Sequence, residues 1–234
     1  MSTTKESTII EVAGGGFVRL DAVMADDASV VNAARVSFAK QREIDELSEV
    51  DKGLINFLMR ERHGTPFEHN SFRFHIKCPI FVAREWFRHR IGSFNEFSAR
   101  YSEVPNEFYV PEYEDIRTQV GKPGSYSFEP TDFDTAVDAV GIVKLANEQA
   151  YKLYTTLIER GVAKELARVV LPVSMMTQFY WTVNARSLMN FLSLRTHETA
   201  QRDIRTYALA VEELFAEAMP VTHDAWNKND RIAP

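Results

Sequence analysis

A basic window that runs from Arg84 to Tyr101 has the clearest capacity for chemistry. It contains four arginines and one histidine against two glutamates, in a chain whose formal net charge is −6. Crowded guanidinium groups repel one another, so a fold tolerates them best where a planar anion such as a phosphate lies between them. A solvated basic face is the simpler alternative, but the aromatic residues of the window argue against full solvation. The basic members are Arg84, Arg88, His89, Arg90 and Arg100.

Neutral hydrogen-bonding groups and further arginines extend this set. Ser93, Asn95 and Ser98 lie between the arginines of the window and can both donate and accept hydrogen bonds. Three more arginines lie at the ends of predicted elements, where ligand-holding side chains concentrate. A pI near 5.6 and the lack of lysine-rich stripes disfavour duplex nucleic acid as the anion. The pattern therefore predicts a small phosphorylated ligand. The three arginines are Arg168, Arg186 and Arg195.

The sequence offers no strong nucleophile and no metal-binding pattern. Cys78 is the only cysteine and ends an alternating apolar run, so we expect a buried thiol and no disulfide or multi-cysteine zinc site. His63, His69 and His75 recur every six residues, which matches no zinc motif, so no metal is expected. Serine-hydrolase and zinc-protease motifs are also absent from the sequence. Chemistry beyond acid–base or electrostatic assistance would need a cofactor.

Composition sets the class of protein. The 234 residues are 45% hydrophobic and 26% charged, which is typical of a soluble globular protein. No convincing linker divides the chain, so residues 1–234 are expected to form one domain. Apolar runs stay below the ~18 residues of a membrane span. Residues 1–7 form a polar lead without the apolar core of a signal peptide, and a cytoplasmic protein is expected.

Strands are predicted on both sides of the window. Short strands over 9–12 and 17–20 flank three glycines, for which a hairpin turn is favoured over a phosphate loop. Strict alternation over 71–78 predicts a strand that buries one face, with His75 on the other. The aromatic and β-branched run over 178–183 predicts another strand.

Helical periodicity and end signals predict the remaining elements. The basic window is expected to begin on the rigid helix over 80–90 and to end on a loop that contains Gly92. Residues 39–50 and 102–133 are interpreted as irregular, the second as a long connection that could cover a site. No element is predicted after Pro220. The helices are expected over 26–38, 53–62, 80–90, 135–159, 163–171, 185–194 and 199–218. Phe81 and Phe87 are interpreted as core contacts of the helix over 80–90, and Asn184 is expected to cap the helix over 185–194. An apolar stripe that includes Val137, Val140 and Leu153 is expected on the helix over 135–159.

The window carries a family signature. Its residues Arg88-His89-Arg90-x-x-Ser93-x-Asn95-x-x-Ser98-x-Arg100 resemble the motif R-H-R-x-x-S-x-N-x-x-S-x-R of the flavin-dependent thymidylate synthases, the ThyX family. Seven fixed residue types within thirteen positions make this a specific signal. The resemblance extends through further segments of the chain. These are residues 34–38, 63–69, 168–172, 181–192 and 194–195.

The resemblance implies a methyltransferase that converts dUMP to dTMP. In that family 5,10-methylenetetrahydrofolate donates the carbon, NADPH reduces a tightly bound FAD, and the reduced flavin supplies the hydride. No cysteine nucleophile is required, which agrees with a sole cysteine outside the motif. The family also implies an α/β (α+β) fold with a central, mainly antiparallel sheet flanked by helices. It implies a homotetramer whose sites are shared between subunits. A non-catalytic nucleotide- or RNA-binding module on the same fold is the alternative.

Site residues are carried over from the family position by position. Arg195 is expected to be catalytic, because a guanidinium near N3 and O4 of uracil would stabilise negative charge that develops on the ring. Glu85 stands where the family often has glutamine, and a carboxylate there would need a partner such as Arg84 or His89. The expected FAD ligands are Ser37, His63, Thr65, Arg88, His89, Arg90, Glu96, Asn184, Arg186 and Asn190. The expected dUMP ligands are Glu85, Arg88, Glu96, Ser98, Arg100, Arg168 and Arg195.

Overall fold

A five-stranded sheet forms the centre of the molecule in the computed structural model, which describes residues 8–41, 43–122 and 125–234. Its strand order is β1-β2-β3-β7-β4, and every neighbouring pair is antiparallel. The predicted antiparallel sheet is therefore confirmed, whereas the predicted polar lead over 1–7 lies outside the described residues. The strands are β1 (Ile9–Val12), β2 (Gly16–Met24), β3 (Ser71–Pro79), β4 (Ser93–Glu96) and β7 (Met176–Asn184).

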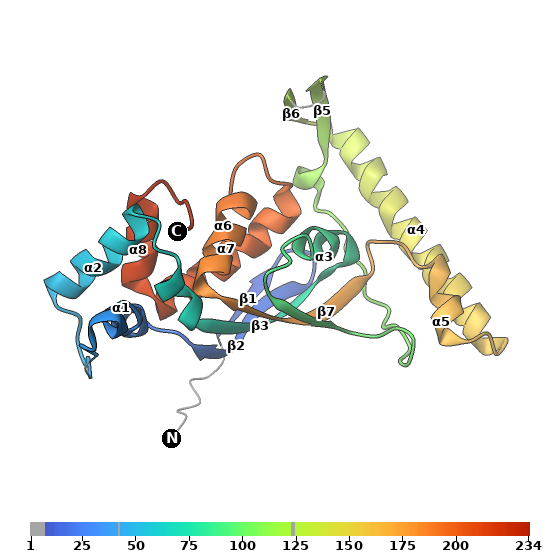
Figure 1. The fold of residues 1–234 in the computed structure, drawn as a ribbon. Coiled ribbons are helices and arrows are strands. Elements are labelled where there is room, and N and C mark those ends of the chain that lie inside the picture. Colours follow the sequence, from blue (N-terminus) through green and yellow to red (C-terminus); the bar gives the residue numbers. More distant parts are fainter. Residues whose placement is uncertain (1–7, 42, 123–124) are drawn as a thin grey trace.

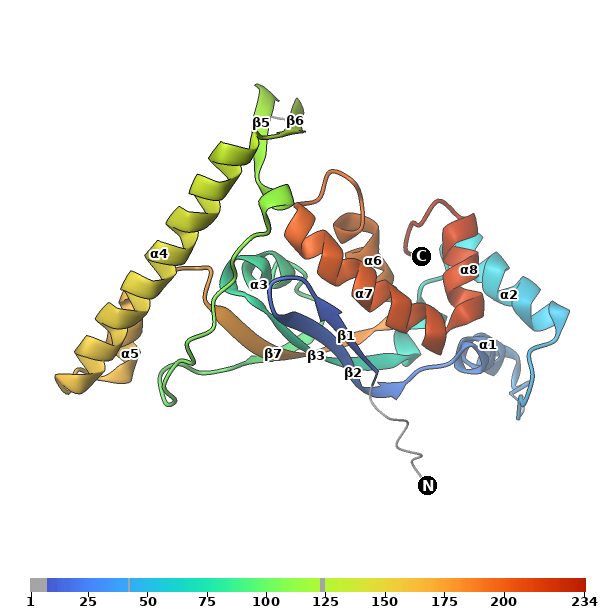
Figure 2. The same cartoon turned by 180° about the vertical axis from the view of Figure 1, so that it is seen from behind.

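Helices cover one face of this sheet. Figures 1 and 2 show α3, α6 and α7 above it, with α1, α2 and α8 at one end and the long α4 leaning away at the other. None of the described helices covers the opposite face of the sheet. The helices are α1 (Asp27–Arg35), α2 (Glu49–Arg60), α3 (Ile80–Trp86), α4 (Phe133–Glu159), α5 (Lys164–Ala167), α6 (Ala185–Arg195), α7 (Arg202–Ala218) and α8 (Pro220–Lys228). Short 3-10 turns occupy Val36–Phe38, Thr65–His69, Tyr113–Asp115 and Arg168–Val170.

The alternation of β3 separates the two faces of the sheet. Its apolar side chains, including that of Cys78, are fully buried beneath the helices, as predicted. Burial raises the pKa of the Cys78 thiol well above its ordinary value. On the opposite face, His75 Nε2 lies 3.0 Å from Gln178 Oε1, and its ring stacks on Tyr180 with centroids 4.9 Å apart. The strand thus joins an apolar core to a polar surface.

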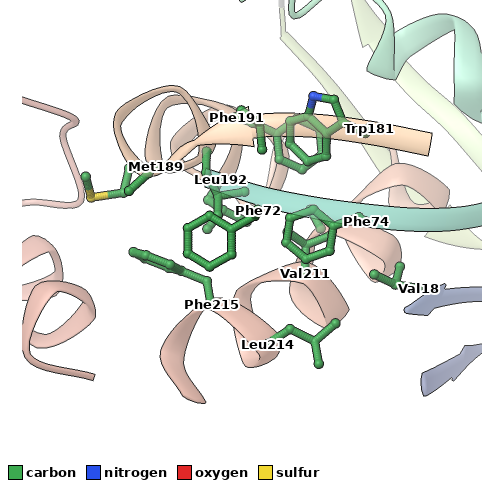
Figure 3. Close-up of a cluster of buried hydrophobic side chains, with 14 of the residues drawn as sticks. Val18, Phe72, Phe74, Trp181, Met189, Phe191, Leu192, Val211, Leu214 and Phe215 are labelled. Carbon is green, nitrogen blue, oxygen red and sulfur yellow. The ribbon is translucent and has the colours of Figure 1, made fainter. Parts of the chain in front are cut away.

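The main core lies between the sheet and α6 and α7. Figure 3 shows Phe72 and Phe74 from β3 meeting side chains of both helices. The indole of Trp181 packs against Phe74 and Phe191, with ring centroids 5.7 and 4.9 Å apart. Trp86 of α3 joins the same aromatic cluster through Phe191 at 4.9 Å. These contacts fix α3 and α6 against the sheet, and the two helices carry the candidate site residues Glu85, Arg186, Asn190 and Arg195.

Local capping explains where several helices begin. Ser48 and Asp51 form a reciprocal capping box, which starts α2 at Glu49, ahead of the predicted position 53. Asn184 caps α6 by accepting a hydrogen bond from the backbone N–H of Ser187, as predicted. The last helix of the protein does not end before Pro220. This proline lies in the first turn of α8, a helix that was not predicted from the sequence.

The basic window folds differently from the prediction. The helix α3 ends at Trp86, so the residues from Arg88 to Arg90 form a turn and not a helix. The His89 N–H bonds to the Trp86 carbonyl three residues back, a tightening typical of a helix end. The part predicted as a loop includes β4, which pairs with β7 at the edge of the sheet. One turn therefore joins a helix to a strand within the basic window.

The connection over 102–133 is less irregular than predicted. It contains an exposed hairpin made of β5 (Arg117–Lys122) and β6 (Ser125–Pro130), which Figure 1 shows near the start of α4. In α4 the predicted apolar stripe is only partly buried: Val140 is buried, whereas Val137 and Leu153 are exposed. Ile142 and Leu145 are exposed as well. Across the described part of the chain, no helix has the length and apolar character needed to cross a membrane.

Candidate active site

The ends of α3 and α6 meet at Arg195. Its Nε donates to Nε2 of His89 at 3.0 Å, its Nη1 to Oε2 of Glu85 at 2.9 Å, and its Nη2 to the Glu85 carbonyl at 3.1 Å. The side chains of Arg195 and Glu85 are 20% and 29% exposed, so the ion pair is partly shielded from water and still accessible. The carboxylate therefore pairs with Arg195, and not with Arg84 or His89 as the sequence analysis expected.

His89 is neutral in this arrangement. Burial and, secondly, the positive charge of Arg195 lower the pKa of His89 from 6.5 to about 4. An arginine only donates hydrogen bonds, so Nε2 of His89 must be the unprotonated ring nitrogen. The ring also packs edge-on against Phe191, with centroids 4.9 Å apart. His89 thus orients Arg195 without adding a charge to the site.

An open cavity of about 840 Å³ surrounds this ion pair. Arg84 on α3 and Arg88 in the turn after it both line the cavity. Phe81 and Phe87 supply apolar surface beside the charged groups. The full lining consists of Phe81, Arg84, Glu85, Phe87, Arg88, Val173 and Arg195. We refer to it as the Arg195 cavity.

A second cavity, of about 530 Å³, shares Arg84 and Phe87 with the first. Its lining includes Glu96 of β4, which accepts a hydrogen bond from Thr177 Oγ1 at 2.7 Å, and Arg168. We refer to it as the Arg168 cavity. Of the predicted dUMP ligands, five line this cavity or the Arg195 cavity. These are Glu85, Arg88, Glu96, Arg168 and Arg195.

Two predicted dUMP ligands, Ser98 and Arg100, lie outside both linings. Arg100 reaches the Arg168 cavity indirectly, because its Nη2 lies 3.3 Å from Oε2 of Glu165, which lines that cavity. The Glu165 carbonyl in turn accepts a hydrogen bond from Nε of Arg168 at 3.3 Å. Glu165 therefore bridges two of the expected dUMP ligands.

A third cavity, of about 780 Å³, lies beside α6 and the turn after α3. Arg186 stands at its wall, where Nη1 donates to Oε1 of Glu68 and Nε to the Pro234 carbonyl. Arg88 and Arg195 line this cavity and the Arg195 cavity alike. We refer to it as the Arg186 cavity. The predicted FAD ligands that line it are Arg88, His89, Arg90, Asn184, Arg186 and Asn190.

The other predicted FAD ligands do not lie together with these. Ser37, His63 and Thr65 line a separate cavity of about 740 Å³ between α1, α2 and the turn Thr65–His69, where His63 contacts the ring of Phe57. Glu96 lines the Arg168 cavity instead. Most of the expected flavin ligands thus line the Arg186 cavity. The remaining ones line two other cavities of the same chain.

Several lining residues were missed by the sequence analysis. Phe81 and Phe87 were interpreted as core contacts, and Arg84 had no assigned role, although their helical spacing placed them near Glu85. Glu68 and Pro234 lie far from Arg186 in sequence, and no local pattern predicts that they would hold it. The described residues contain no cluster of histidine, cysteine and acidic side chains suited to a metal ion.

The donor groups of the Arg186 cavity suit a flavin dinucleotide. Guanidinium groups from Arg88, Arg90 and Arg186 can neutralise a pyrophosphate, and the amide of Asn190 can hydrogen-bond to neutral polar atoms. Ile91 and Leu194 add apolar surface for a planar ring. A volume of about 780 Å³ is within the range of cofactor pockets. The residues present therefore fit the group.

Fold and cavities together define an α+β protein with open, arginine-rich cavities whose guanidinium groups suit phosphorylated small molecules. Comparison with known proteins gives the family. A family model described as thymidylate synthase complementing protein matches residues 19–221. The flavin-dependent thymidylate synthase of Thermosipho africanus is 50% identical over 91% of either chain, and that of Streptomyces coelicolor is 45% identical over 96% of either chain.

A solved structure gives the same relationship in three dimensions. The UMP/dUMP methylase PolB from Streptomyces cacaoi, bound with 5-Br UMP, is 44% identical and superposes with a TM-score of 0.87. The match covers 96% of this chain and all of that one. The chain therefore belongs to the thymidylate synthase complementing protein family, that is, to the flavin-dependent thymidylate synthases.

Proposed function

We propose that the protein methylates dUMP to dTMP as a flavin-dependent thymidylate synthase. The overall reaction consumes 5,10-methylenetetrahydrofolate, NADPH and a proton, and it releases dTMP, tetrahydrofolate and NADP⁺. The observation that carries the proposal is that Arg88 and Arg195 line both the Arg195 cavity and the Arg186 cavity. A pyrimidine in the first and a flavin ring in the second would meet at these two side chains.

Arg195 would serve as the electrostatic catalyst. Its guanidinium is fixed by His89 and Glu85 and remains accessible from the cavity. A preoriented cation beside the pyrimidine would stabilise negative charge on the ring as C5 attacks the methylene carbon. Because the arginine is held before substrate binds, little reorganisation would be needed during the reaction.

FAD would lie in the Arg186 cavity, where bound flavin, once reduced by NADPH, supplies the hydride. Arg88, Arg90 and Arg186 would hold its phosphates, and Asn184 and Asn190 its neutral polar atoms. His89 would contribute from the same cavity and Glu96 from the Arg168 cavity. Ser37, His63 and Thr65 would contribute from their own cavity.

The phosphate of dUMP would bind near Arg100 and Arg168, with Ser98 as a neutral donor. Glu165 contacts both arginines and would have to yield to the phosphate. Both ends of the Arg100–Glu165 pair are more than half exposed, so exchanging this carboxylate for a phosphate has a low energetic cost. By holding the phosphate, Ser98, Arg100 and Arg168 would orient the base and so contribute to the rate.

A homotetramer with sites shared between subunits is part of the proposal. The open cavities and the separation of Ser37, His63 and Thr65 from the other flavin ligands support it, because a second copy could complete each site. Large exposed apolar side chains on α4, such as Ile142 and Leu145, offer surface for assembly. We also propose that residues 1–234 form one domain and that the protein is cytoplasmic.

An activity assay tests the proposal directly. The purified protein should be yellow and should release tritium from C5-tritiated dUMP when methylenetetrahydrofolate and NADPH are present. Colourless protein that neither binds added FAD nor releases tritium would refute it. A nucleotide- or RNA-binding module is the second candidate, favoured only by the basic and aromatic character of the window. Salt-sensitive oligonucleotide binding without flavin would support that candidate instead.

A further inference from the structure

We propose that the last residues of the chain, 231–234, form a strap that positions Arg186 for the phosphates of FAD. The Pro234 carbonyl holds Nε of Arg186, which leaves the remaining N–H groups of the guanidinium for the ligand. The inference rests on the proposed function, because it takes FAD to lie in the Arg186 cavity. It adds a positioning residue, Pro234, that lies far from the family signature in the basic window.

The end of the chain is fastened to the body of the protein. Chain ends are loose unless specific contacts hold them, but here Pro234 is buried, and Figures 1 and 2 show the end of the chain lying between α8 and α6. The Pro234 carbonyl accepts a hydrogen bond from Nε of Arg186 at 2.5 Å, and Nη1 of Arg62 lies 3.4 Å from the Ala233 carbonyl. Both Ala233 and Pro234 line the Arg186 cavity. The strap is therefore part of the cavity wall.

Arg231 anchors the other end of the strap. Its guanidinium donates to both carboxylate oxygens of Glu212, at 2.8 and 2.6 Å, and to Oγ1 of Thr196 at 2.9 Å. It also lies over the ring of Trp226, 4.0 Å from a ring centroid. The Arg231 carbonyl accepts a hydrogen bond from the hydroxyl of Ser193. None of these anchoring residues lines the Arg186 cavity, so the strap is held at a point away from the proposed ligand.

The strap runs along α6 and matches its length. Arg186 and Ser193 are seven residues apart in α6, which places them on the same face of the helix. Seven residues of α-helix rise about 10 Å, and the three residues that separate the Arg231 carbonyl from the Pro234 carbonyl reach at most about 11 Å. The strap therefore has little slack between its two contacts with α6, which fixes the Pro234 carbonyl beside Arg186.

Two contacts orient the guanidinium of Arg186. Nε donates to the Pro234 carbonyl and Nη1 donates to Oε1 of Glu68 at 2.5 Å, whereas the other N–H groups have no partner in the part of the chain that the structure describes. The side chain is 47% exposed and lines the cavity. Holding a planar group at two positions limits its rotation, so less freedom is lost when a phosphate binds. A Cβ at Gly64 would lie 2.9 Å from the Pro234 carbonyl, so a side chain there would disturb the contact.

Flavin binding to a truncated protein tests the inference. Ending the chain after Ile232 removes the Pro234 carbonyl and keeps the Arg231 anchor. The dissociation constant of FAD, measured by dilution of the flavin-loaded protein, should rise about tenfold, because Arg186 loses a charge-assisted hydrogen bond that orients it. Pro234→Ala is the matched control, because it keeps the backbone carbonyl, and its FAD dissociation constant should stay within about twofold of the wild type.

A double-mutant cycle separates positioning from a general loss of structure. The truncation is repeated in an Arg186→Gln background, and urea unfolding checks that each protein is folded. Because the strap acts through Arg186, the truncation should change the FAD dissociation constant by less than about twofold in this background. A full tenfold effect there would show that the strap acts independently of Arg186 and would overturn the inference.

The remaining outcomes are distinguishable. Unchanged FAD affinity on truncation, or an equal loss in Pro234→Ala, would overturn the inference, and tritium release by the wild type would leave the proposed function standing. Should the protein that ends after Ile232 not fold, ending the chain after Ala233 removes Pro234 alone and gives the same comparison. A wild-type protein that binds no FAD and releases no tritium would refute the proposed function and the inference with it.

Discussion

Nε of Arg195 lies 3.0 Å from Nε2 of His89 and donates to it. The contact joins the last residue of α6 to the turn that follows α3, so it links two elements that approach each other only in the folded chain. It also fixes the protonation state of the imidazole.

Arg195→Ala should abolish turnover and leave the flavin bound. The guanidinium is expected to act on the charge that develops in the pyrimidine, and removing such a group costs a factor of about 10² to 10³ in kcat. Tritium release from C5-labelled dUMP measures turnover, and the visible spectrum measures flavin content. Near-normal turnover would remove Arg195 from the catalytic role, and a colourless variant would show that it also holds the flavin.

His89 should make folding stability depend on pH between about 6.5 and 4. Its pKa is about 4 in the folded protein and 6.5 when exposed, so the unfolded chain binds the proton more readily within this range. Stability is therefore full above pH 6.5 and decreases as the pH falls towards 4. Urea unfolding at several pH values measures the effect. His89→Gln, which keeps an acceptor for Arg195, should flatten the curve in this range, and an unaltered slope would contradict the assignment.

Glu212→Gln should destabilise the fold by about 3 kcal/mol at pH 7. Burial would raise the pKa of Glu212, but hydrogen bonds from His223 and Arg231 outweigh it and lower the pKa to about 2. Arg231 holds both carboxylate oxygens, at 2.8 and 2.6 Å. Because the folded pKa is depressed, the stabilisation is present above pH 4.5 and is lost as the pH falls from 4.5 towards 2.

Chemical unfolding at pH 7 checks this prediction. Glu213→Gln is the matched control, since it removes the neighbouring carboxylate on the exposed side of α7 and should change stability by less than about 0.5 kcal/mol. Equal effects of the two substitutions would show that the Glu212–Arg231 pair contributes nothing specific.

Gly64→Ala should weaken flavin binding without unfolding the protein. A Cβ at Gly64 would lie 2.5 Å from Nε of Arg186 and 2.9 Å from the Pro234 carbonyl, so Arg186 would have to move. Loss of one charged contact predicts an affinity about tenfold lower. Gly53→Ala is the control, because its Cβ would meet open space within α2 and should stabilise the helix by up to about 1 kcal/mol. Unchanged flavin affinity in Gly64→Ala would argue against a role for Arg186.

The sequence predicted the elements whose signal is local. The alternation of β3 and the cap at Asn184 depend on neighbouring residues, and both are confirmed. The helix over 80–90 was extended too far, because the apolar pattern continues through Phe87, whose ring packs against Phe94 of β4 and not on a further helical turn. Pairing of β4 with β7 is a long-range event that four residues of sequence cannot indicate.

In the candidate site, too, local sequence signals were predictable and long-range contacts were not. Arg88 and Arg90 of the motif both line the Arg186 cavity, whereas Arg100 of the same motif does not. The motif did not predict that Glu85 pairs with a residue 110 positions away, or that Pro234 accepts a hydrogen bond from Arg186. Such contacts follow from how α3, α6 and the C-terminal residues pack. The partner of a charge, which decides its chemistry, was therefore the least predictable part.

The buried position of Cys78 makes the protein suited to site-specific spectroscopy. It is the only thiol of the chain, it is fully inaccessible, and burial suppresses its ionisation. A maleimide or spin label would therefore react only with a cysteine introduced at an exposed position, with no need to remove the native one. A label on the exposed hairpin β5–β6 would show whether a second copy of the chain lies close to it, as the proposed homotetramer requires.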